Sequence, residues 1–334
     1  MRPDDVDDRA IADWCAMWLR ARPTEILASH GHLSRVSELL LANGRRVVVK
    51  VRPSQTRLAG CAYVQQHLWR AGFPCPEPLI GPVPFGNGTG LAASAEAWVP
   101  GGDMLRPGDP GAVDGYATLL ARMIRLAPPA ARLPSLDPPP PWNAWNHGGP
   151  GVWPAADDRP DDLNTLPDTA FLDEVGRAVQ QRLTAFAANM VVGHGDFEAQ
   201  NVRWRELSVA APEAAPLRST AARSAAASRL RHTSAVVHDW DSIIVAPEAT
   251  IVGFAAAVWP SGAGPAATID QTASFIEAYQ HAAGRVWSLD EIGAAWAAGL
   301  WVRAFNEKKW RLDGHVALQP DEAAERLRRA GVTT

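Results

Sequence analysis

Lysine is scarce in this chain of 334 residues. Of its 32 lysines and arginines, only three are lysines: Lys50, Lys308 and Lys309. Cysteine is also rare, and the three cysteines are too few and too scattered for a disulfide framework or a zinc site. No apolar run is long enough to cross a bilayer, and the acidic start of the sequence lacks the apolar core of a signal peptide. We therefore expect a cytoplasmic protein that makes no use of a membrane.

Other absences narrow the class of function. The net charge of -4 provides no basic footprint for nucleic acid. No G-x-x-x-x-G-K-[ST] motif is present, so a P-loop NTPase is not expected. The sequence has no internal repeat, and nothing in it points to a particular oligomeric state. Its length suffices for a substantial core and two lobes of ordinary domain size.

The most informative stretch reads Val-Gly-His-Gly-Asp-Phe-Glu-Ala-Gln-Asn and covers residues 192–201. It places His194, Asp196 and Asn201 at the spacing H-x-D-x-x-x-x-N. A carboxylate at this point can accept the proton of an attacking hydroxyl, and an amide five residues later can hold Mg²⁺ against nucleotide phosphates. A later apolar run ends in Val-His-Asp-Trp-Asp (237–241) and supplies carboxylates, which hard Mg²⁺ prefers as ligands. The order of these segments predicts a phosphoryl-transfer site.

The motif H-G-D-F-x-x-x-N followed by V-H-D-W-D resembles the motifs of the aminoglycoside phosphotransferase and choline kinase superfamily of small-molecule kinases. The resemblance extends, more loosely, from about Leu27 to Trp310. It implies a bilobal, protein-kinase-like α+β fold with a small antiparallel-sheet lobe and a larger, mainly helical lobe. It also implies an enzyme that uses ATP and Mg²⁺ to phosphorylate a hydroxyl group of a small molecule. Gly195 stands where protein kinases usually carry arginine, which favours a small-molecule acceptor over a protein.

Within this resemblance, Asp196 is the catalytic carboxylate, and Asn201 and Asp239 are the magnesium ligands. Asp241 is the alternative ligand because it follows the same strand closely, but Asp239 matches the aspartate of the family motif. His194 can be interpreted as a general base, whereas the resemblance gives it a bracing role through hydrogen bonds to nearby groups.

A hairpin is predicted where two apolar runs, 36–41 and 45–51, flank Asn43-Gly44, a dipeptide favoured in tight primed turns. Lys50 lies on the second strand and faces away from Val49 and Val51. The resemblance assigns to this position the lysine that grips the α- and β-phosphates of the nucleotide. The alternative is a lysine that extends along a strand face with its charge in water.

The family pairs this lysine with a glutamate on the following helix, and here the chain departs from the pattern. The helix predicted from Arg57 to Ala71 contains no aspartate or glutamate, and Cys61 or Gln65 lies near the expected position. Either another carboxylate orients Lys50, or the affinity for the nucleotide is weak.

Two further segments are expected to contact the nucleotide. Gly31 and Ser34 belong to a short loop before the first hairpin strand, where backbone amides can cradle phosphate oxygens; an ordinary turn is the alternative. Glu96 and Trp98 match the hinge between the lobes, whose backbone would bind the edge of the adenine. A tryptophan in the core of the lobe interface is equally compatible with this position.

We expect an N-terminal helical extension over residues 1–22, a nucleotide-binding lobe over 23–99 and a catalytic and acceptor lobe over 100–334. Within the last, residues 206–234 are rich in Ala, Ser, Arg and Pro and lack an apolar period. We interpret them as a disordered insertion that leaves Asn201 and Asp239 close in space, with an acceptor-binding loop as the alternative.

Helical periodicity adds predictions for the rest of the chain. Helices are expected at about 8–21, with Trp18 on the buried stripe, and through the apolar positions between Phe171 and Phe186. Residues 128–167 are expected to be largely irregular. Two helices would close the chain, the second one starting at a capping box formed by Ser288 and Glu291.

The chemistry of the acceptor stays open at this point. A polycationic antibiotic would suit the acidic C-terminal part, in which four aspartates cluster: Asp157, Asp158, Asp161 and Asp162. A metabolic alcohol such as a sugar, a choline-like amine or an amino alcohol is equally compatible. The alternative from another class is a catalytically degenerate, kinase-like protein that binds a nucleotide without turnover.

Overall fold

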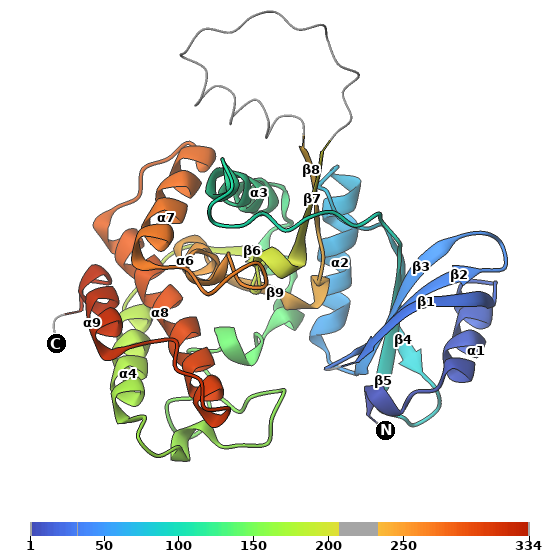
Figure 1. The fold of residues 1–334 in the computed structure, drawn as a ribbon, viewed down its shortest axis with the longest axis horizontal. Helices are drawn as coiled ribbons and strands as arrows, with labels where there is room; N and C mark the ends of the chain where they lie inside the picture. The colour runs from blue at the N-terminus through green and yellow to red at the C-terminus, as the bar shows by residue number, and fades with distance from the viewer. Residues whose placement is uncertain (1, 32, 207–232, 333–334) are drawn as a thin grey trace, which may run out of the picture.

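The chain starts with a five-stranded antiparallel sheet that carries one helix on each face, and continues into a mainly helical part (Figure 1). The computed structural model describes residues 2–31, 33–206 and 233–332. The predicted α+β fold class is therefore confirmed. Among the described residues, no helix is both long and apolar enough to span a membrane.

The sheet has the strand order β1–β2–β3–β5–β4, and every neighbouring pair is antiparallel. Its strands are β1 (Pro23–Gly31), β2 (Arg35–Leu41), β3 (Arg46–Pro53), β4 (Pro78–Phe85) and β5 (Leu91–Ala97). The predicted hairpin around Asn43-Gly44 joins β2 to β3. Val47, Val49 and Val51 of β3 are fully buried on one face, so Lys50 faces the other side as its alternation predicts.

Helix α1 (Asp8–Trp18) covers the valine face of the sheet and shares one apolar cluster with it. Ile11, Trp14 and Cys15 are buried there. The expectation that Trp18 belongs to the buried stripe is wrong, since its side chain is 39% exposed. The helix ends at this residue, so its last ring is only partly covered.

Helix α2 (Arg57–Arg70) lies between the sheet and the helical part of the molecule (Figure 1). Its apolar residues Cys61, Val64 and Leu68 belong to the same buried cluster as the helices that follow. The structure thus connects the sheet to the helical part through α2. The division of the chain at residues 22 and 99 stays a prediction.

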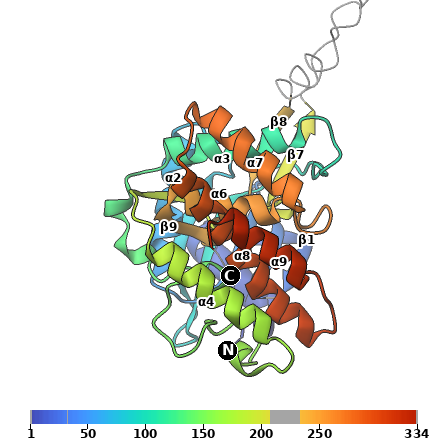
Figure 2. The same cartoon turned by 90° about the vertical axis from the view of Figure 1, so that its left-hand side faces the viewer.

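Six helices of the described residues make up most of the helical part of the molecule (Figure 2): α3 (Ala112–Leu126), α4 (Ala170–Thr184), α6 (Glu248–Val258), α7 (Ile269–Ala283), α8 (Leu289–Leu312) and α9 (Pro320–Arg329). The predicted capping box at Ser288 and Glu291 begins α8. The expectation of two closing helices is wrong, because α9 follows α8. Residues 128–167 contain only short 3₁₀ turns, as predicted.

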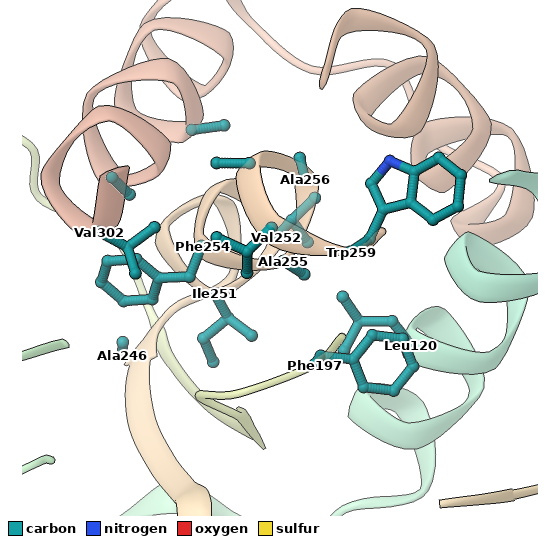
Figure 3. Close-up of a cluster of buried hydrophobic side chains, with 14 of the residues drawn as sticks. Leu120, Phe197, Ala246, Ile251, Val252, Phe254, Ala255, Ala256, Trp259 and Val302 are labelled. Atoms are coloured by element: carbon teal, nitrogen blue, oxygen red, sulfur yellow. The ribbon is translucent and has the colours of Figure 1, made fainter. Parts of the chain in front are cut away.

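Helix α6 lies at the centre of this part and is surrounded by apolar side chains from α3, α8 and the loop after β6 (Figure 3). Every residue from Ala249 to Val258 is buried. Gly253 lets α8 approach closely, because a side chain there would collide with the carbonyl group of Ala295. A helix that is apolar all round has no amphipathic period, which explains why its sequence predicts no helix.

Two short antiparallel ribbons support the loop that contains Asp196. One pairs β6 (Met190–His194) with β9 (Ile243–Pro247), and the other pairs β7 (Val202–Glu206) with β8 (Thr233–Val237). Most of the predicted insertion 206–234 lies outside the described residues. The ribbon of β7 and β8 brings the two ends of this segment together, because Glu206 pairs with Thr233. At the other end of the ribbon, the His238 N–H donates to the Asn201 carbonyl at 2.8 Å.

Candidate active site

His194 ends β6 and is fully buried beneath the loop that follows. Its Nε2 lies 3.0 Å from the carbonyl oxygen of His238, and its Nδ1 accepts a hydrogen bond from the Asp196 N–H at 3.2 Å. A ring that donates through Nε2 and accepts through Nδ1 is a neutral imidazole with both nitrogens engaged. This geometry supports the bracing interpretation of His194 over that of a general base.

Asn201 joins the two ends of the same loop. Its Nδ2 donates to the backbone carbonyl of Asp196 and to the carboxylate oxygen Oδ2 of the same residue, each at 2.9 Å. The side-chain carbonyl of Asn201 is then the atom that can bind a cation. The amide therefore fixes the carboxylate of Asp196 and can serve as a metal ligand at the same time.

A second carboxylate, Glu198, lies beside Asp196 and was not predicted. Its side chain is only 8% exposed and accepts a hydrogen bond from Gln200. Burial, together with the charges of Glu198 and Asp239, raises the pKa of Asp196 well above its usual range. Burial also raises the pKa of Glu198. In the sequence, the signal that could have identified Glu198 as a site residue was its position two places after Asp196.

Lys50 reaches from β3 to the aspartates that follow β8. Its Nζ lies 2.9 Å from Asp239 Oδ1 and 3.7 Å from Asp241 Oδ1. Burial acts to lower the pKa of Lys50, but these carboxylates outweigh it and the net shift is upward. Gln65, one of the two residues expected near the position of the family's glutamate, donates to Glu96 Oε2 at 2.9 Å. The carboxylates near Lys50 thus come from β5 and from the segment after β8.

Asp239 and Asp241 have different neighbours. Asp239 lies directly after His238, whose backbone is bound to His194 and Asn201 at the two ends of the loop that contains Asp196, and it accepts a hydrogen bond from Ser242 at 3.0 Å. Asp241 forms an ion pair with Arg52 and faces β3 and α2 instead. Burial alone would raise the pKa of Asp239, but Lys50 and the hydrogen bonds it accepts lower it, so Asp239 is ionised. The geometry favours Asp239 over Asp241 as the neighbour of Asn201.

Asp239 and Asn201 fit a magnesium ion in the chemistry of their donor atoms. No group of three His, Cys, Asp or Glu side chains within the described ranges is arranged to hold a metal by itself. Mg²⁺ at nucleotide sites commonly takes one or two carboxylates from the protein and its other ligands from phosphates and water. A pair of oxygen ligands, one of them ionised, agrees with that pattern.

A cavity of about 150 Å³ lies beneath the sheet next to the segment predicted as the hinge. Glu96, Trp98 and Val99 line it, together with His238. The guanidinium carbon of Arg46 stacks 3.4 Å from the centre of the Trp98 ring. The N–H groups of Ala97 and Trp98 already donate to the carbonyls of Glu77 and Arg46, at 2.8 and 3.1 Å. Val99, the next residue along the chain, belongs to the same cavity wall.

A second cavity of about 450 Å³ opens beside Asp239 and includes Ser34 in its wall. Trp142 and Asp157 also line it, together with the proline run Pro138–Pro141. Gly31 is not among the lining residues and packs instead against Asp4 near the N-terminus. Of the two loop residues predicted to cover phosphates, the structure therefore brings only Ser34 to the site.

The four clustered aspartates, which a polycationic acceptor would suit and for which a solvated acidic loop is the alternative, are partly engaged in contacts within the fold. Asp158 forms an ion pair with Lys309 at 2.5 Å. Asp162 accepts a hydrogen bond from the backbone N–H of Asn164 at 3.0 Å. Asp157 is the member of the cluster that lines the larger cavity.

Comparison with known proteins identifies one matching family and several structures with a similar fold. The model of the phosphotransferase enzyme family, APH, matches residues 25–211. Among solved structures, an amicoumacin kinase in complex with AMP-PNP and Ca²⁺ superposes with a TM-score of 0.59, at 11% identity over 98% of this chain and 92% of that one. A spectinomycin phosphotransferase in complex with ADP and spectinomycin gives a TM-score of 0.55 at 10% identity, over 98% and 94% of the two chains.

A type I macrolide 2'-phosphotransferase gives a TM-score of 0.54 at 15% identity, over 99% of this chain and 97% of the other. At these identities the likeness establishes the shared fold. The search among curated proteins gives no match.

Proposed function

Because the chain belongs to the phosphotransferase enzyme family, we propose that it transfers the γ-phosphoryl group of ATP to a hydroxyl group of a small molecule, with Mg²⁺ as cofactor. One observation carries this proposal: Asn201 holds Asp196 by two hydrogen bonds, Lys50 pairs with Asp239, and the N–H of His238, next to Asp239, donates to the Asn201 carbonyl. Phosphoryl transfer needs a proton acceptor, metal ligands and a cation for the phosphates. These four side chains supply each of them.

ATP would bind with its adenine in the cavity of about 150 Å³ and its phosphates directed toward Lys50. The N–H of Val99 and the neighbouring carbonyls would bind the adenine edge, since the N–H groups of Ala97 and Trp98 are already engaged. Lys50 carries three N–H donors, so it can contact phosphate oxygens while Asp241 and Glu96 still orient it. These two carboxylates take the place of the absent helix glutamate.

Asn201 and Asp239 would hold the magnesium ion, which neutralises charge on the β- and γ-phosphates. Asp196 would orient the acceptor hydroxyl in line with the γ-phosphate and accept its proton, a role that contributes about 10²–10⁴-fold in general base catalysis. Holding the two reactants in line contributes about 7–11 kcal/mol in well-oriented systems.

The acceptor would enter the cavity of about 450 Å³, which adjoins Asp239 and has a volume typical of small-molecule sites. Pro138–Pro141 and Trp142 contribute apolar surface to its wall, and Arg57 and Asp157 contribute charged groups. This combination suits a hydroxylated molecule with an apolar face.

The test is a panel of sugars, amino alcohols, choline-like amines and hydroxylated antibiotics, each incubated with the protein and Mg-ATP. We expect acceptor-dependent release of ADP and a phosphomonoester resonance in the ³¹P spectrum of one class. Tight ATP binding without phosphate transfer to any member of the panel would favour the degenerate, non-catalytic alternative.

A further inference from the structure

The carbonyl oxygen of Gly195, the residue before Asp196, accepts two side-chain hydrogen bonds from a distant segment. Trp142 Nε1 and Asn143 Nδ2 both donate to it, each at 3.1 Å. The donors belong to the 3₁₀ turn η4 (Pro141–Asn143) and precede Gly195 by 53 and 52 positions. At the other end of the same peptide bond, the Asp196 N–H is held by His194. The plane of the peptide that leads into Asp196 is therefore fixed on both sides.

The turn η4 is well suited to hold these donors in place. Four successive prolines, Pro138–Pro141, lead into it, and each proline ring restricts the backbone angle φ. The Asn143 N–H donates to the Pro140 carbonyl at 2.9 Å, and the Asn143 side chain is only 2% exposed. The turn also packs against α8. Because the prolines already restrict this backbone in the unfolded chain, ordering the turn costs less backbone entropy.

The same contact explains why residue 195 is a glycine. A side chain there would collide with Asn143 Oδ1 and approach Ile244 Cγ2 to 3.0 Å. Gly195 is not among the glycines with a positive φ, so the requirement is one of space. The H-G-D sequence therefore depends on a partner that lies far away in the chain.

We propose that Asn143 and Trp142 are positioning residues that hold the carboxylate of Asp196 in line for phosphoryl transfer. The inference rests on the proposed function, because it takes Asp196 as the group that meets the acceptor. The two residues differ in one respect. Trp142 lines the cavity of about 450 Å³ beside Asp239, whereas Asn143 does not. Asn143 therefore acts on the reaction through Gly195, and Trp142 also presents its ring to the cavity.

Two substitutions test the inference by separating kcat from KM. Trp142→Phe removes the N–H and keeps an aromatic ring in the cavity wall, and Asn143→Ala removes the buried donor. We expect kcat to fall about tenfold in each and on the order of 10²-fold in the double variant, as small misplacements of reacting groups do. The KM for ATP should stay at its wild-type value. Trp145→Phe is the matched control, because Trp145 belongs to the same segment but is not a donor to Gly195.

Hydrogen exchange of the loop amides, measured by mass spectrometry on a peptide covering residues 190–201, gives a readout that needs no acceptor. We expect faster exchange in both variants and wild-type exchange in Trp145→Phe. If the wild type phosphorylates no acceptor, the proposed function fails, and exchange still decides whether Asn143 and Trp142 hold the loop.

Unchanged kcat or unchanged loop exchange in the folded double variant would overturn the inference. An equal rise in the KM for ATP would overturn it as well, because a general loss of structure would then explain the result. If Asn143→Ala fails to fold, Trp142→Phe alone decides by the same criteria.

Discussion

Replacing Asp239 and Asp241 one at a time by asparagine separates the two roles that the site gives them. Both carboxylates lie near Lys50 Nζ, at 2.9 and 3.7 Å, and asparagine preserves the shape of each side chain. Asp239 adjoins the catalytic loop, whereas Asp241 pairs with Arg52. We expect Asp239→Asn to weaken the binding of Mg²⁺ to the nucleotide complex. We expect Asp241→Asn to weaken the binding of the nucleotide itself.

The expected magnitudes follow from these contacts. Loss of a residue that only supports a metal ligand costs about 10–100-fold in metal affinity, so loss of the Asp239 charge should cost roughly 100-fold or more. Asp241→Asn removes one contact to Lys50, while Asp239 and Glu96 remain. At 3.7 Å this contact is an ion pair without a hydrogen bond, and such pairs contribute up to about 1 kcal/mol, which corresponds to about a fivefold rise in the Kd of ADP.

Titration calorimetry of ADP at a series of Mg²⁺ concentrations measures both effects without an acceptor. Asp290→Asn serves as control, because Asp290 pairs with Arg182 on the exposed surface. A larger shift of the Mg²⁺ dependence in Asp241→Asn than in Asp239→Asn would refute the assignment and exchange the two roles.

Two further predictions concern stability. Asp173→Ala should lower the free energy of unfolding by about 3–5 kcal/mol, because it removes the ion pair of the fully buried Lys308 at 2.6 Å. Denaturant unfolding measures this, with Asp290→Ala as the exposed control. A loss of stability no larger than that of the control would contradict the prediction. Replacing residues 207–232 by Asn-Gly should preserve folding, Mg²⁺ dependence and ADP affinity, because β7 and β8 are already paired up to Glu206 and Thr233; a collapse of the thermal midpoint would contradict the interpretation of this segment as an insertion.

The parts of the fold that the sequence predicts are those in which local pattern and burial agree. Alternating valines in β3 predict which face Lys50 takes, and the apolar period of α4 and the capping box of α8 predict those helices. Helix α6 escapes prediction because all its faces are buried, so no period distinguishes it from a buried strand. Short antiparallel ribbons such as β7 and β8 depend on pairing with a distant partner.

In the site, too, local sequence pattern predicts some residues and misses those that arrive from distant segments. The spacing in the sequence predicts Asp196, Asn201 and Asp239 as site residues, because phosphoryl transfer would need these groups in a fixed order. Spacing cannot identify the partners that reach the loop from elsewhere, such as Trp142 at Gly195 or Glu96 near Lys50. Those contacts arise only from tertiary packing.

One measurement tests the central claim most directly: single-turnover transfer of the γ-phosphoryl group to an accepted hydroxyl compound, in the wild type and in Asp196→Asn, with ADP affinity determined in parallel. The account predicts a phosphate ester in the wild type, almost none in Asp196→Asn, and nearly equal affinity for ADP, because Asp196 acts on the acceptor. An Asp196→Asn variant that retains most of the wild-type transfer rate would contradict the account.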